Sequence, residues 1–529
     1  MDLKHVIPQQ RRRTFGPSLD IQYSVDRSDV PRVGPTPVFT RASSGTFVNE
    51  NRRIVGKTTS TTSLNPASVP VGGVAVFAVP SGSVVGWLNN SVVSVMVDSD
   101  GNDQIGSEAH VTGTLLHKTN TAITLLVASK VGTATVSSWF VSYRGQRIDH
   151  DPATGRCLGT LIEEGRTNLY SRSENFSDAA WGKTRSTVQS GFSDPSGGTA
   201  AFKLIEDTTA SNTHTLTNGT TPPATAHTLS VFAKKGERTW IVLRLGGNNT
   251  FFNLDNGTIA AGSVNSPTIT NFGNGWYRCT VTSSAGTQGQ FWLATNSTTT
   301  SYTGDGTSGL FIWGAQLEAG LNATSYIPTT ATSVARSAEV PTISGGEFSR
   351  FYNQTEGTFI VNYDRSITSG GGTKFNWMVL AAYNPASSST YNVIVATTTA
   401  DARTIYRNSG TDVYGPVPSL SAAGTLVKIG YRYQSGSFIT TKNGSVVSTG
   451  TGTIPAISTF DRIDFGFSNN GSFGASSIQY LNGHINSIRY YRNPLSNAQH
   501  QTLTAIVTET IVFNGVPIWY NGEGLIETT

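Results

Sequence analysis

The sequence has little charge and little cysteine. Lys, Arg, Asp and Glu together make up 13% of its 529 residues, about half the share of an average globular protein. The 37 basic and 33 acidic residues leave a net charge of +4. A charge this dilute excludes the basic surface with which proteins bind nucleic acid. The two cysteines cannot build a disulfide framework, and they suit synthesis in a reducing compartment.

Long apolar runs are also absent. No stretch reaches the roughly 18 apolar residues of a membrane-spanning helix. The start of the chain, which leads into Pro8 and Arg11, lacks the apolar core of a signal peptide. We therefore expect synthesis in a cytosol and no membrane insertion. The dense basic run Arg11–Arg13 is expected in a solvated N-terminal arm, or else docked on an acidic neighbour.

Short β-strand patterns recur along the whole chain. Runs of about five to eight residues, rich in β-branched and aromatic types, alternate with clusters of Gly, Asn, Asp and Ser. Ser91–Val97 is one such run, and Phe252–Ile259 spans two short runs with an Asp-Asn-Gly turn between them. Asn443 and Gly444 tolerate positive φ, so they predict a tight hairpin.

Helical periodicity does not persist over three turns anywhere in the sequence. Short helices are expected only near Glu163–Glu164 and at Ser496–Leu503. The strand spacing favours sandwiches and jelly rolls. The predicted fold class is all-β, with tandem antiparallel β-sandwich or jelly-roll domains behind an N-terminal attachment arm.

Familiar ligand-binding motifs are scarce. None of the eight histidines stands at metal-ligand spacing from a second His, Cys or Glu, and no Gly-x-Ser-x-Gly elbow occurs. Gly304–Gly309 matches Gly-x-Gly-x-x-Gly, but a strand pattern follows it where a dinucleotide site needs a helix. Asp98–Asp103 lacks the glycine and the final glutamate of a calcium loop. The first is predicted to be a loop between strands, the second a hairpin turn.

Paired carboxylates are the remaining catalytic option, because glycosidases act through two of them. The candidate pairs are Glu163 with Glu164, Asp149 with Asp151, and Asp461 with Asp464. The first and third pairs point to opposite sides of a strand, and the second lies in a turn. The sequence thus predicts no catalytic, cofactor or metal site and a protein that is not an enzyme, although a site assembled across subunits would escape this reasoning.

Aromatic residues are plentiful: 9 Trp, 18 Tyr and 24 Phe. Because aromatic faces stack on sugar rings, some of them could form a glycan platform. Trp276 and Trp313 lie in strand patterns and are expected in the core. Trp240 fits either role, and Cys279 is expected to pack as a small apolar group. The ligand-binding residues stay unassigned.

Several motifs resemble known families. The first group, which resembles the N-terminal module of tailed-bacteriophage tail-fibre and virion proteins, comprises Phe39–Phe47, Asp149–Gly155 and Leu161–Leu169. The second, similar to a carbohydrate-binding jelly roll, comprises Ser173–Phe176, Gly275–Arg278, Phe311–Glu318 and Thr324–Thr330. The third, similar to a concanavalin/laminin-G-like sandwich, comprises Thr441–Gly444, Gly483–Tyr491 and Pro494–Ser496.

Composition and resemblance together divide the chain into five parts. These are an N-terminal arm and attachment module at 1–55, continued at 148–167; an inserted small β-domain at 56–147; a jelly roll at 168–338; a laminin-G-like sandwich at 345–505; and a C-terminal β tail at 506–529. The inserted domain departs from the family pattern. The C-terminal sandwich shows no recognisable lectin-type calcium-ligand set.

The resemblance implies a bacteriophage virion structural protein, either a tail fibre or a tail-associated host-recognition protein that binds host cell-surface glycans. It would be made in the bacterial cytoplasm, reside in the virion and contact other virion proteins through its N-terminal arm. A homotrimer is expected, because fibre proteins of this kind are usually threefold. The alternatives are a virion-associated polysaccharide depolymerase and a head decoration or head-fibre protein.

Overall fold

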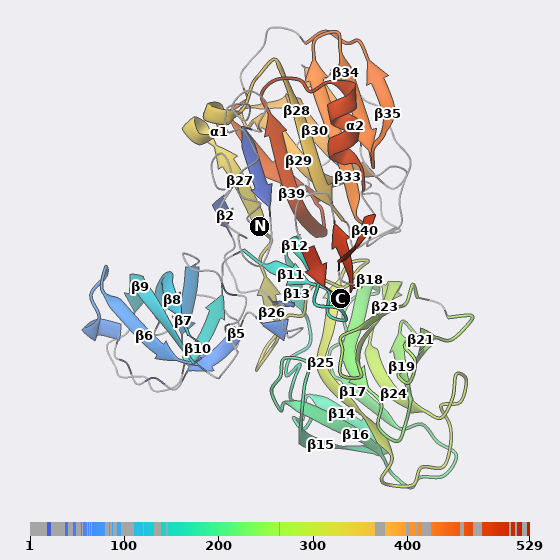
Figure 1. Cartoon of the computed structure of the whole chain (residues 1–529). Coiled ribbons are helices and arrows are strands. Elements are labelled where there is room, and N and C mark those ends of the chain that lie inside the picture. The colour runs from blue at the N-terminus through green and yellow to red at the C-terminus, as the bar shows by residue number, and fades with distance from the viewer. Residues whose placement is uncertain are drawn as a thin grey trace. The chain divides into compact units, whose positions relative to one another are not determined.

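The computed structural model consists mainly of antiparallel β-sheets (Figure 1). It describes residues 18–22, 38–40, 46–48, 54–55, 57–60, 62, 64, 66–79, 84, 87, 92–96, 110–119, 121–131, 139–143, 146–263, 265–364, 376–397, 403–408, 411–414, 425–454, 460–468, 479–506, 509–513, 516–520 and 526–528. Among these residues, no helix has the length and apolar character needed to cross a membrane. The all-β class predicted from the sequence is confirmed.

The described residues fall into two compact units. One contains the described residues from 40 to 339, and the other contains those up to 39 and those from 340 onward. The five-part division predicted from the sequence is finer than this and stays a prediction.

A six-stranded antiparallel sheet lies in the early part of the first unit, with strand order β5-β10-β7-β8-β9-β6. Its strands are β5 (Lys57–Ser60), β6 (Val74–Ala78), β7 (Val92–Met96), β8 (His110–Lys118), β9 (Ala122–Val131) and β10 (Trp139–Tyr143), and a 3-10 turn, η3, covers Pro66–Ser68. Phe77, Val95 and Leu125 are buried in one core on one face of this sheet. Strand β7 confirms the strand pattern seen at Ser91–Val97.

The larger part of the first unit is a sandwich of two six-stranded antiparallel sheets, which form the jelly roll. The sheet here called the β19 sheet has the order β14-β17-β24-β19-β20-β21, and the β25 sheet has the order β15-β16-β25-β18-β23-β22. The strands are β14 (Trp181–Thr184), β15 (Ser186–Phe192), β16 (Ala201–Glu206), β17 (Thr215–Asn218), β18 (Thr225–Lys234), β19 (Trp240–Leu245), β20 (Asn248–Asn253), β21 (Thr258–Ile259), β22 (Thr268–Asn271), β23 (Trp276–Gly286), β24 (Gly289–Ala294) and β25 (Gly309–Ala319). The β20–β21 pair confirms the turn predicted within Phe252–Ile259.

Short strands complete the first unit. They are β3 (Phe47–Val48) paired with β4 (Ile54–Val55), β11 (Ile148–His150) paired with β12 (Cys157–Ile162), and β13 (Arg166–Asn168) paired with β26 (Val334–Arg336). Strand β2 (Val38–Thr40) straddles the boundary in sequence between the two units. The helix predicted near Glu163–Glu164 is wrong. The chain there continues from β12, and the Glu163 carbonyl accepts a hydrogen bond from the Glu339 N–H at 3.2 Å. This pairing between distant segments overrides local helix propensity.

The second unit is a second two-sheet sandwich. In one sheet β28 pairs with β39 and with β33, which continues to β34 and β35, while β1 pairs with β39; the other sheet runs β27-β36-β29-β30-β31-β32. The strands are β1 (Leu19–Gln22), β27 (Val340–Ser344), β28 (Glu356–Tyr363), β29 (Asn376–Asn384), β30 (Ser387–Thr397), β31 (Arg403–Asn408), β32 (Thr411–Tyr414), β33 (Val427–Gln434), β34 (Phe438–Lys442), β35 (Ser445–Gly450), β36 (Arg462–Phe465), β37 (Phe467–Ser468), β38 (Gln479–Tyr480) and β39 (Gly483–Tyr491), followed by β40 (Glu509–Phe513), β41 (Val516–Tyr520) and β42 (Ile526–Thr528).

The turn between β34 and β35 is the hairpin that the sequence predicted. Asn443 and Gly444 adopt φ angles of 49° and 84°, as a tight hairpin of this type requires. Helix α2 (Asn497–Thr504) confirms the predicted C-terminal helix. Its start is a capping box, in which Ser496 accepts from the Gln499 N–H and the Gln499 side chain accepts from the Ser496 N–H, a pattern that satisfies two free N–H groups.

Helix α1 (Gly345–Phe351) was not expected from the sequence, since it begins with two glycines that disfavour a helix. Its buried residues Phe348 and Phe351 explain why it forms. Phe348 stacks on Tyr352, and Phe351 meets Tyr490 of β39 edge to face. Packing in the sandwich therefore compensates for the weak propensity.

His500 of α2 generates a pH prediction. The side chain is fully buried, and its Nδ1 lies 2.9 Å from Thr441 Oγ1. Burial, with a smaller effect from the charge of Arg432, lowers the pKa of His500 to about 3. A depressed pKa means that the neutral form is favoured by folding, so stability is full above the unfolded value of 6.5 and falls as the pH drops toward the folded value.

We expect His500→Gln to remove this pH dependence. Between pH 6 and pH 5 the variant should lose less stability than the parent by about 1.4 kcal/mol per pH unit, measured by urea unfolding followed through the loss of the second unit's aromatic signal. Exposed His117 offers the control His117→Gln, which should keep the parent's slope. Equal slopes for the parent and His500→Gln would refute the assignment.

Candidate functional site

The β19 sheet presents one face to the sandwich core and the other face away from it. Ile241, Leu243 and Leu245 of β19 are completely buried in the core, together with Phe291 and Leu293 of β24. Side chains alternate between the faces of a strand. The residues between these core positions therefore point outward.

The strand register arranges these outward residues in three rows. The rows, read across β20, β19, β24 and β17, are Asn253, Trp240 and Ala294; then Phe251, Val242, Trp292 and Thr215; then Asn249, Arg244, Gln290 and Thr217. We call Trp240, Arg244, Asn249, Phe251, Gln290 and Trp292 the outer face. All six are partly exposed.

The outer face carries three aromatic side chains that are partly exposed, although large aromatic residues are usually buried in a core. Phe251 and Trp292 flank Val242, which is completely buried between its neighbours. Since neighbouring strands lie about 4.8 Å apart, the backbones that carry these two rings lie about 10 Å from one another. Trp240 lies in the adjoining row. The rings thus offer apolar surface to solvent over a span comparable with a small oligosaccharide.

Polar contacts hold the rings in place. The guanidinium carbon of Arg244 lies 5.0 Å from the centre of the Trp292 ring, a cation–π geometry. Arg244 Nη1 donates to Asn249 Oδ1 at 2.8 Å, and Trp292 Nε1 donates to Gln290 Oε1 at 2.9 Å. Apolar rings beside a few fixed polar groups form the usual composition of a small-molecule site.

The structure resolves the roles of the tryptophans that the sequence singled out. Trp276 and Trp313 are both 3% exposed and pack with Phe232 and Tyr326, so their predicted core positions are confirmed. Trp240, which fitted either role, lies on the outer face. Cys279 is buried in the sandwich core, as predicted.

Only Trp240 of the outer face was singled out from the sequence. The other five residues were missed, which are Arg244, Asn249, Phe251, Gln290 and Trp292. The alternation in Gln290–Leu293 shows that Phe291 and Trp292 face opposite ways. It does not show which of them faces the core. That choice depends on the register with β19, which pairs Phe291 with Leu243 and Trp292 with Val242.

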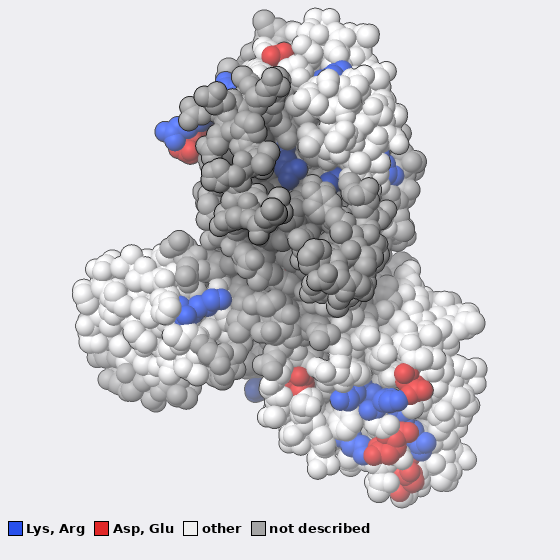
Figure 2. Space-filling model, viewed as in Figure 1, with Lys and Arg blue, Asp and Glu red and all other residues white. Residues whose placement is uncertain are grey.

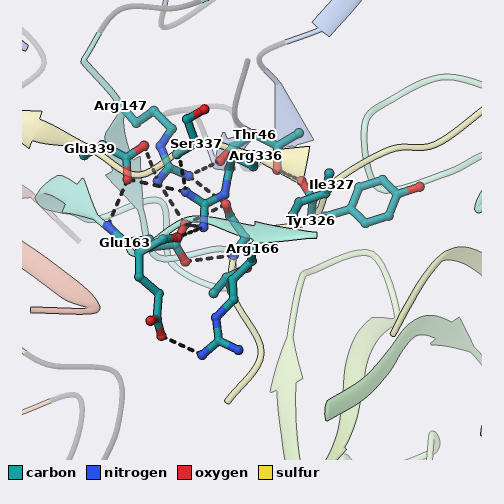
Figure 3. A network of polar contacts seen from close by, with 12 residues as sticks. Thr46, Arg147, Glu163, Arg166, Tyr326, Ile327, Arg336, Ser337 and Glu339 are labelled. Carbon is teal, nitrogen blue, oxygen red and sulfur yellow. Dashed lines mark hydrogen bonds and ion pairs between the residues drawn. The ribbon is translucent and has the colours of Figure 1, made fainter. Parts of the chain in front are cut away.

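The two members of each predicted carboxylate pair do not act together, because each lies in a different environment. Glu163 lies in a buried network, where its Oε2 is 2.9 Å from Arg147 Nη2 and 3.4 Å from Arg336 Nη2. Arg147 also contacts Glu339 at 2.7 Å, and the four side chains point toward one another (Figure 3). Glu164 instead pairs with Arg166 at 2.5 Å. Burial alone would raise the pKa of Glu163, but the charges on Arg336 and Arg147 lower it to about 2.

The other predicted carboxylates also have local roles. Asp149 accepts from the Val48 N–H at 2.6 Å, and Asp151 accepts from the N–H groups of the turn that follows it. Asp464 is completely buried and accepts from Tyr383 at 2.6 Å; burial raises its pKa. Asp461 is exposed. The carboxylates of Asp149, Asp151 and Asp464 therefore accept hydrogen bonds that hold the fold.

The jelly-roll motifs that carried the family resemblance close the sandwich. Asn168 Nδ2 donates to the carbonyls of Ala315 at 3.1 Å and Ile327 at 2.8 Å. Gln316 Oε1 accepts from the Ile327 N–H at 2.7 Å, and Glu318 Oε1 accepts from the Thr324 N–H at 2.8 Å. These buried contacts hold the segment after β25 against the sheet, so Asn168, Gln316 and Glu318 stabilise the fold.

The remaining ligand motifs give no site in the described residues. No group of three or more His, Cys, Asp and Glu lies close enough there to hold a metal ion, and the predictions of no metal and no cofactor site stay predictions. The loop at Gly304–Gly309 leads into strand β25, as predicted. Arg11–Arg13 and Asp98–Asp103 lie outside the described residues.

In Figure 2, most of the coloured Lys, Arg, Asp and Glu residues lie on the jelly roll, which is identified by its place in Figure 1. Much of the other described surface in this view is uncharged. Acidic and basic groups are mixed on the jelly roll. The jelly roll's ion pairs include Lys203 with Glu237 at 2.7 Å and Lys235 with Asp255. The surface in view thus shows the scarcity of charge that the composition predicted.

Comparisons with known proteins give partial likenesses. No protein-family model matches the chain, and no curated protein matches it. Among solved structures, the chain is similar to the CBM40 module of a Ruminococcus gnavus IT-sialidase bound to α2,3-sialyllactose, with 16% identity and a TM-score of 0.25 over 29% of this chain and 84% of that one.

Two further solved structures are similar over different shares of the chain. The NanB sialidase from Streptococcus pneumoniae shows 14% identity and a TM-score of 0.26, over 32% of this chain and 27% of that one. Mouse laminin α1 domains LG4–5 show 12% identity and a TM-score of 0.20, over 55% and 88%. Likenesses of this size concern the fold alone; the sandwich folds themselves are established by the strand pairing. None of these three proteins comes from a bacteriophage.

The comparison corrects one expectation from the sequence. We predicted that the protein is not an enzyme, but the similar structures include a sialidase and a module of another. That prediction is therefore wrong, and no proposal for the molecule rests on it. The physical reason is that a search for motifs along one chain detects only sites whose residues are close in sequence.

The buried network around Glu163 generates a stability prediction. Glu163→Gln leaves Arg147 and Arg336 with one carboxylate between them, and losing one partner of a buried ion pair costs about 3–5 kcal/mol. The matched control is Glu164→Gln, which breaks a partly exposed pair and should cost about 0–1 kcal/mol. Denaturant unfolding at pH 7 measures both changes.

The same network also makes the stability of the protein depend on pH. Because the pKa of Glu163 is lowered from 4.5 to about 2, its contribution is present above pH 4.5 and is lost as the pH falls toward 2. The stability difference between the parent and Glu163→Gln should therefore shrink over this range. Equal costs for Glu163→Gln and Glu164→Gln at pH 7 would contradict the account.

Proposed function

We propose that this protein is a carbohydrate-binding structural protein of a bacteriophage virion, a tail fibre or tail-associated protein that recognises host cell-surface glycans. The observation that carries the glycan part is the outer face of the β19 sheet. Trp240, Phe251 and Trp292 are partly exposed on it, beside the polar groups of Arg244 and Asn249.

This composition suits a sugar for a physical reason. A pyranose ring has an apolar face of C–H groups and a rim of hydroxyls. The rings of Phe251 and Trp292 can stack on the first, and the polar row of Asn249, Arg244 and Gln290 can hydrogen-bond the second. The dilute charge of the chain supports the same role, because it limits non-specific electrostatic adhesion.

The virion part of the proposal is supported by the resemblance of the sequence motifs to phage tail-fibre proteins. In this proposal the N-terminal arm contacts other virion proteins, the protein resides in the virion after synthesis in the bacterial cytoplasm, and the sandwiches bind glycan. Several copies on one particle would raise the effective concentration of modest single sites. A head decoration or head-fibre protein is the alternative with a different place on the particle.

Glycan binding through the outer face predicts the effect of one substitution. Trp292→Ala should reduce retention on immobilised host polysaccharide about tenfold or more, because truncating a central aromatic anchor removes over 1 kcal/mol of binding energy. The control is Phe192→Ala, which removes a partly exposed ring from the β25 sheet and should leave retention unchanged.

The same incubation is read a second time for polysaccharide chain length, since progressive shortening would favour the depolymerase alternative. Retention of Trp292→Ala equal to that of the parent would contradict the proposed site. Failure of the parent to be retained on any host polysaccharide would contradict the proposed function.

A homotrimer is the assembly that we propose for the particle-bound protein, because closed rings suit attachment to a symmetric particle. Light scattering of the purified protein should give about three times the chain mass of 56.2 kDa. A monomer at micromolar concentration would contradict this assembly.

A further inference from the structure

Several arginines of the jelly roll pair with a carboxylate, whereas Arg244 has no such pair among the described residues. Arg185 and Arg278 also have no such pair among these residues, but each donates to a backbone carbonyl, of Thr213 and of Thr324. Arg238 forms a two-pronged pair with Glu206, at 2.8 Å from Nε and 2.5 Å from Nη2. Arg166 pairs with Glu164, and Arg172 pairs with Asp178 at 3.1 Å. Within the part of the chain that the structure describes, no carboxylate lies within ion-pair distance of Arg244. Arg244 is thus a partly exposed cation in the third row of the outer face, with no acidic partner in this part of the chain.

The guanidinium group of Arg244 is also fixed in orientation. It lies over the Trp292 ring at 5.0 Å, and its Nη1 donates to Asn249 Oδ1 at 2.8 Å. A guanidinium has five N–H donors in a planar fork. Only one of them donates to Asn249, so the others can donate to a ligand. A group held this way loses little conformational freedom when it binds a ligand.

The chemistry of this fork identifies the ligand. A planar guanidinium matches a carboxylate in a two-pronged hydrogen bond, and it gives up water more readily than an ammonium group. The aromatic row next to it supplies the surface on which a sugar ring can stack. A sugar that bears a carboxylate can bind both rows at once. Its ring would stack on the aromatic row, and its carboxylate would accept hydrogen bonds from Arg244.

We propose that the outer face selects an acidic sugar and that Arg244 is the residue that recognises its carboxylate. This inference rests on the glycan binding proposed above and names the substrate class of the same site. It assigns the aromatic residues to affinity for any sugar, and Arg244 to the discrimination between acidic and neutral sugars.

The test uses paired oligosaccharides that differ only in charge. An array of hexuronic-acid and nonulosonic-acid oligosaccharides is probed beside the methyl esters of the same compounds and beside sulfated neutral oligosaccharides. The full-length proteins are the parent, Arg244→Gln, Arg244→Lys and Trp292→Ala. Near-ultraviolet circular dichroism verifies that each variant keeps the parent's fold.

The parent should bind at least one acid about tenfold or more tightly than its ester, and this preference should weaken as salt is added. Arg244→Gln should abolish the preference, and it should weaken binding of the ester much less than binding of the acid, because the ester loses only hydroxyl contacts. Arg244→Lys should recover only part of the preference, because it keeps the charge and loses the fork. Trp292→Ala should weaken binding of both the acid and the ester, because both stack on its ring.

Several outcomes would overturn the inference. These are equal binding of acid and ester by the parent, equal binding of carboxylated and sulfated sugars, and an equal loss of acid and ester binding in Arg244→Gln. Binding of neutral sugars that depends on Trp292, without tighter binding of any acidic sugar, would overturn it while leaving the proposed function intact. Binding of no sugar by the parent would overturn both.

Discussion

The register between β19 and β24 is the constraint on which the candidate site depends. It pairs Leu243 with Phe291 inside the sandwich and Val242 with Trp292 outside it. A slip of one residue would exchange the two faces of the strand, burying Trp292 and exposing Phe291. The site is therefore specified by the same packing that holds the sandwich together, since the core tolerates only the register that buries Ile241, Leu243 and Leu245.

A second constraint fixes the ends of the jelly roll. The segments that contain Arg147, Glu163, Arg336 and Glu339 are far apart in sequence, and they meet in one buried network of opposite charges (Figure 3). In a chain with 13% charged residues, two buried arginines with two buried glutamates are an unusual concentration. A buried network of this kind favours one arrangement of its segments, because any misplacement leaves a charge without its partner.

What could be predicted from the sequence was local. The hairpin at Asn443–Gly444 and the short helix at Ser496–Leu503 each depend on a few neighbouring residues, and both predictions are confirmed. Trp276 and Trp313 follow strand patterns and are buried as expected. The all-β class follows from many such local signals together.

What could not be predicted depends on contacts between distant residues. Helix α1 forms because Phe351 packs against Tyr490, and the Glu163–Glu164 segment is extended because it pairs with Glu339. The outer face needed the register of four strands before Arg244 and Trp292 could be placed side by side. The expectation of a non-enzymatic protein was wrong for a related reason, since it rested on motifs within one stretch of chain.

The central claim is that a sugar binds on the outer face of the β19 sheet, and the direct measurement is the structure of the full-length protein with a host-derived oligosaccharide bound. The account predicts a sugar ring stacked on Trp292 or Phe251, with a carboxylate within hydrogen-bond distance of Arg244. A sugar bound elsewhere on the protein, with the outer face of this sheet unoccupied at saturating ligand, would contradict it.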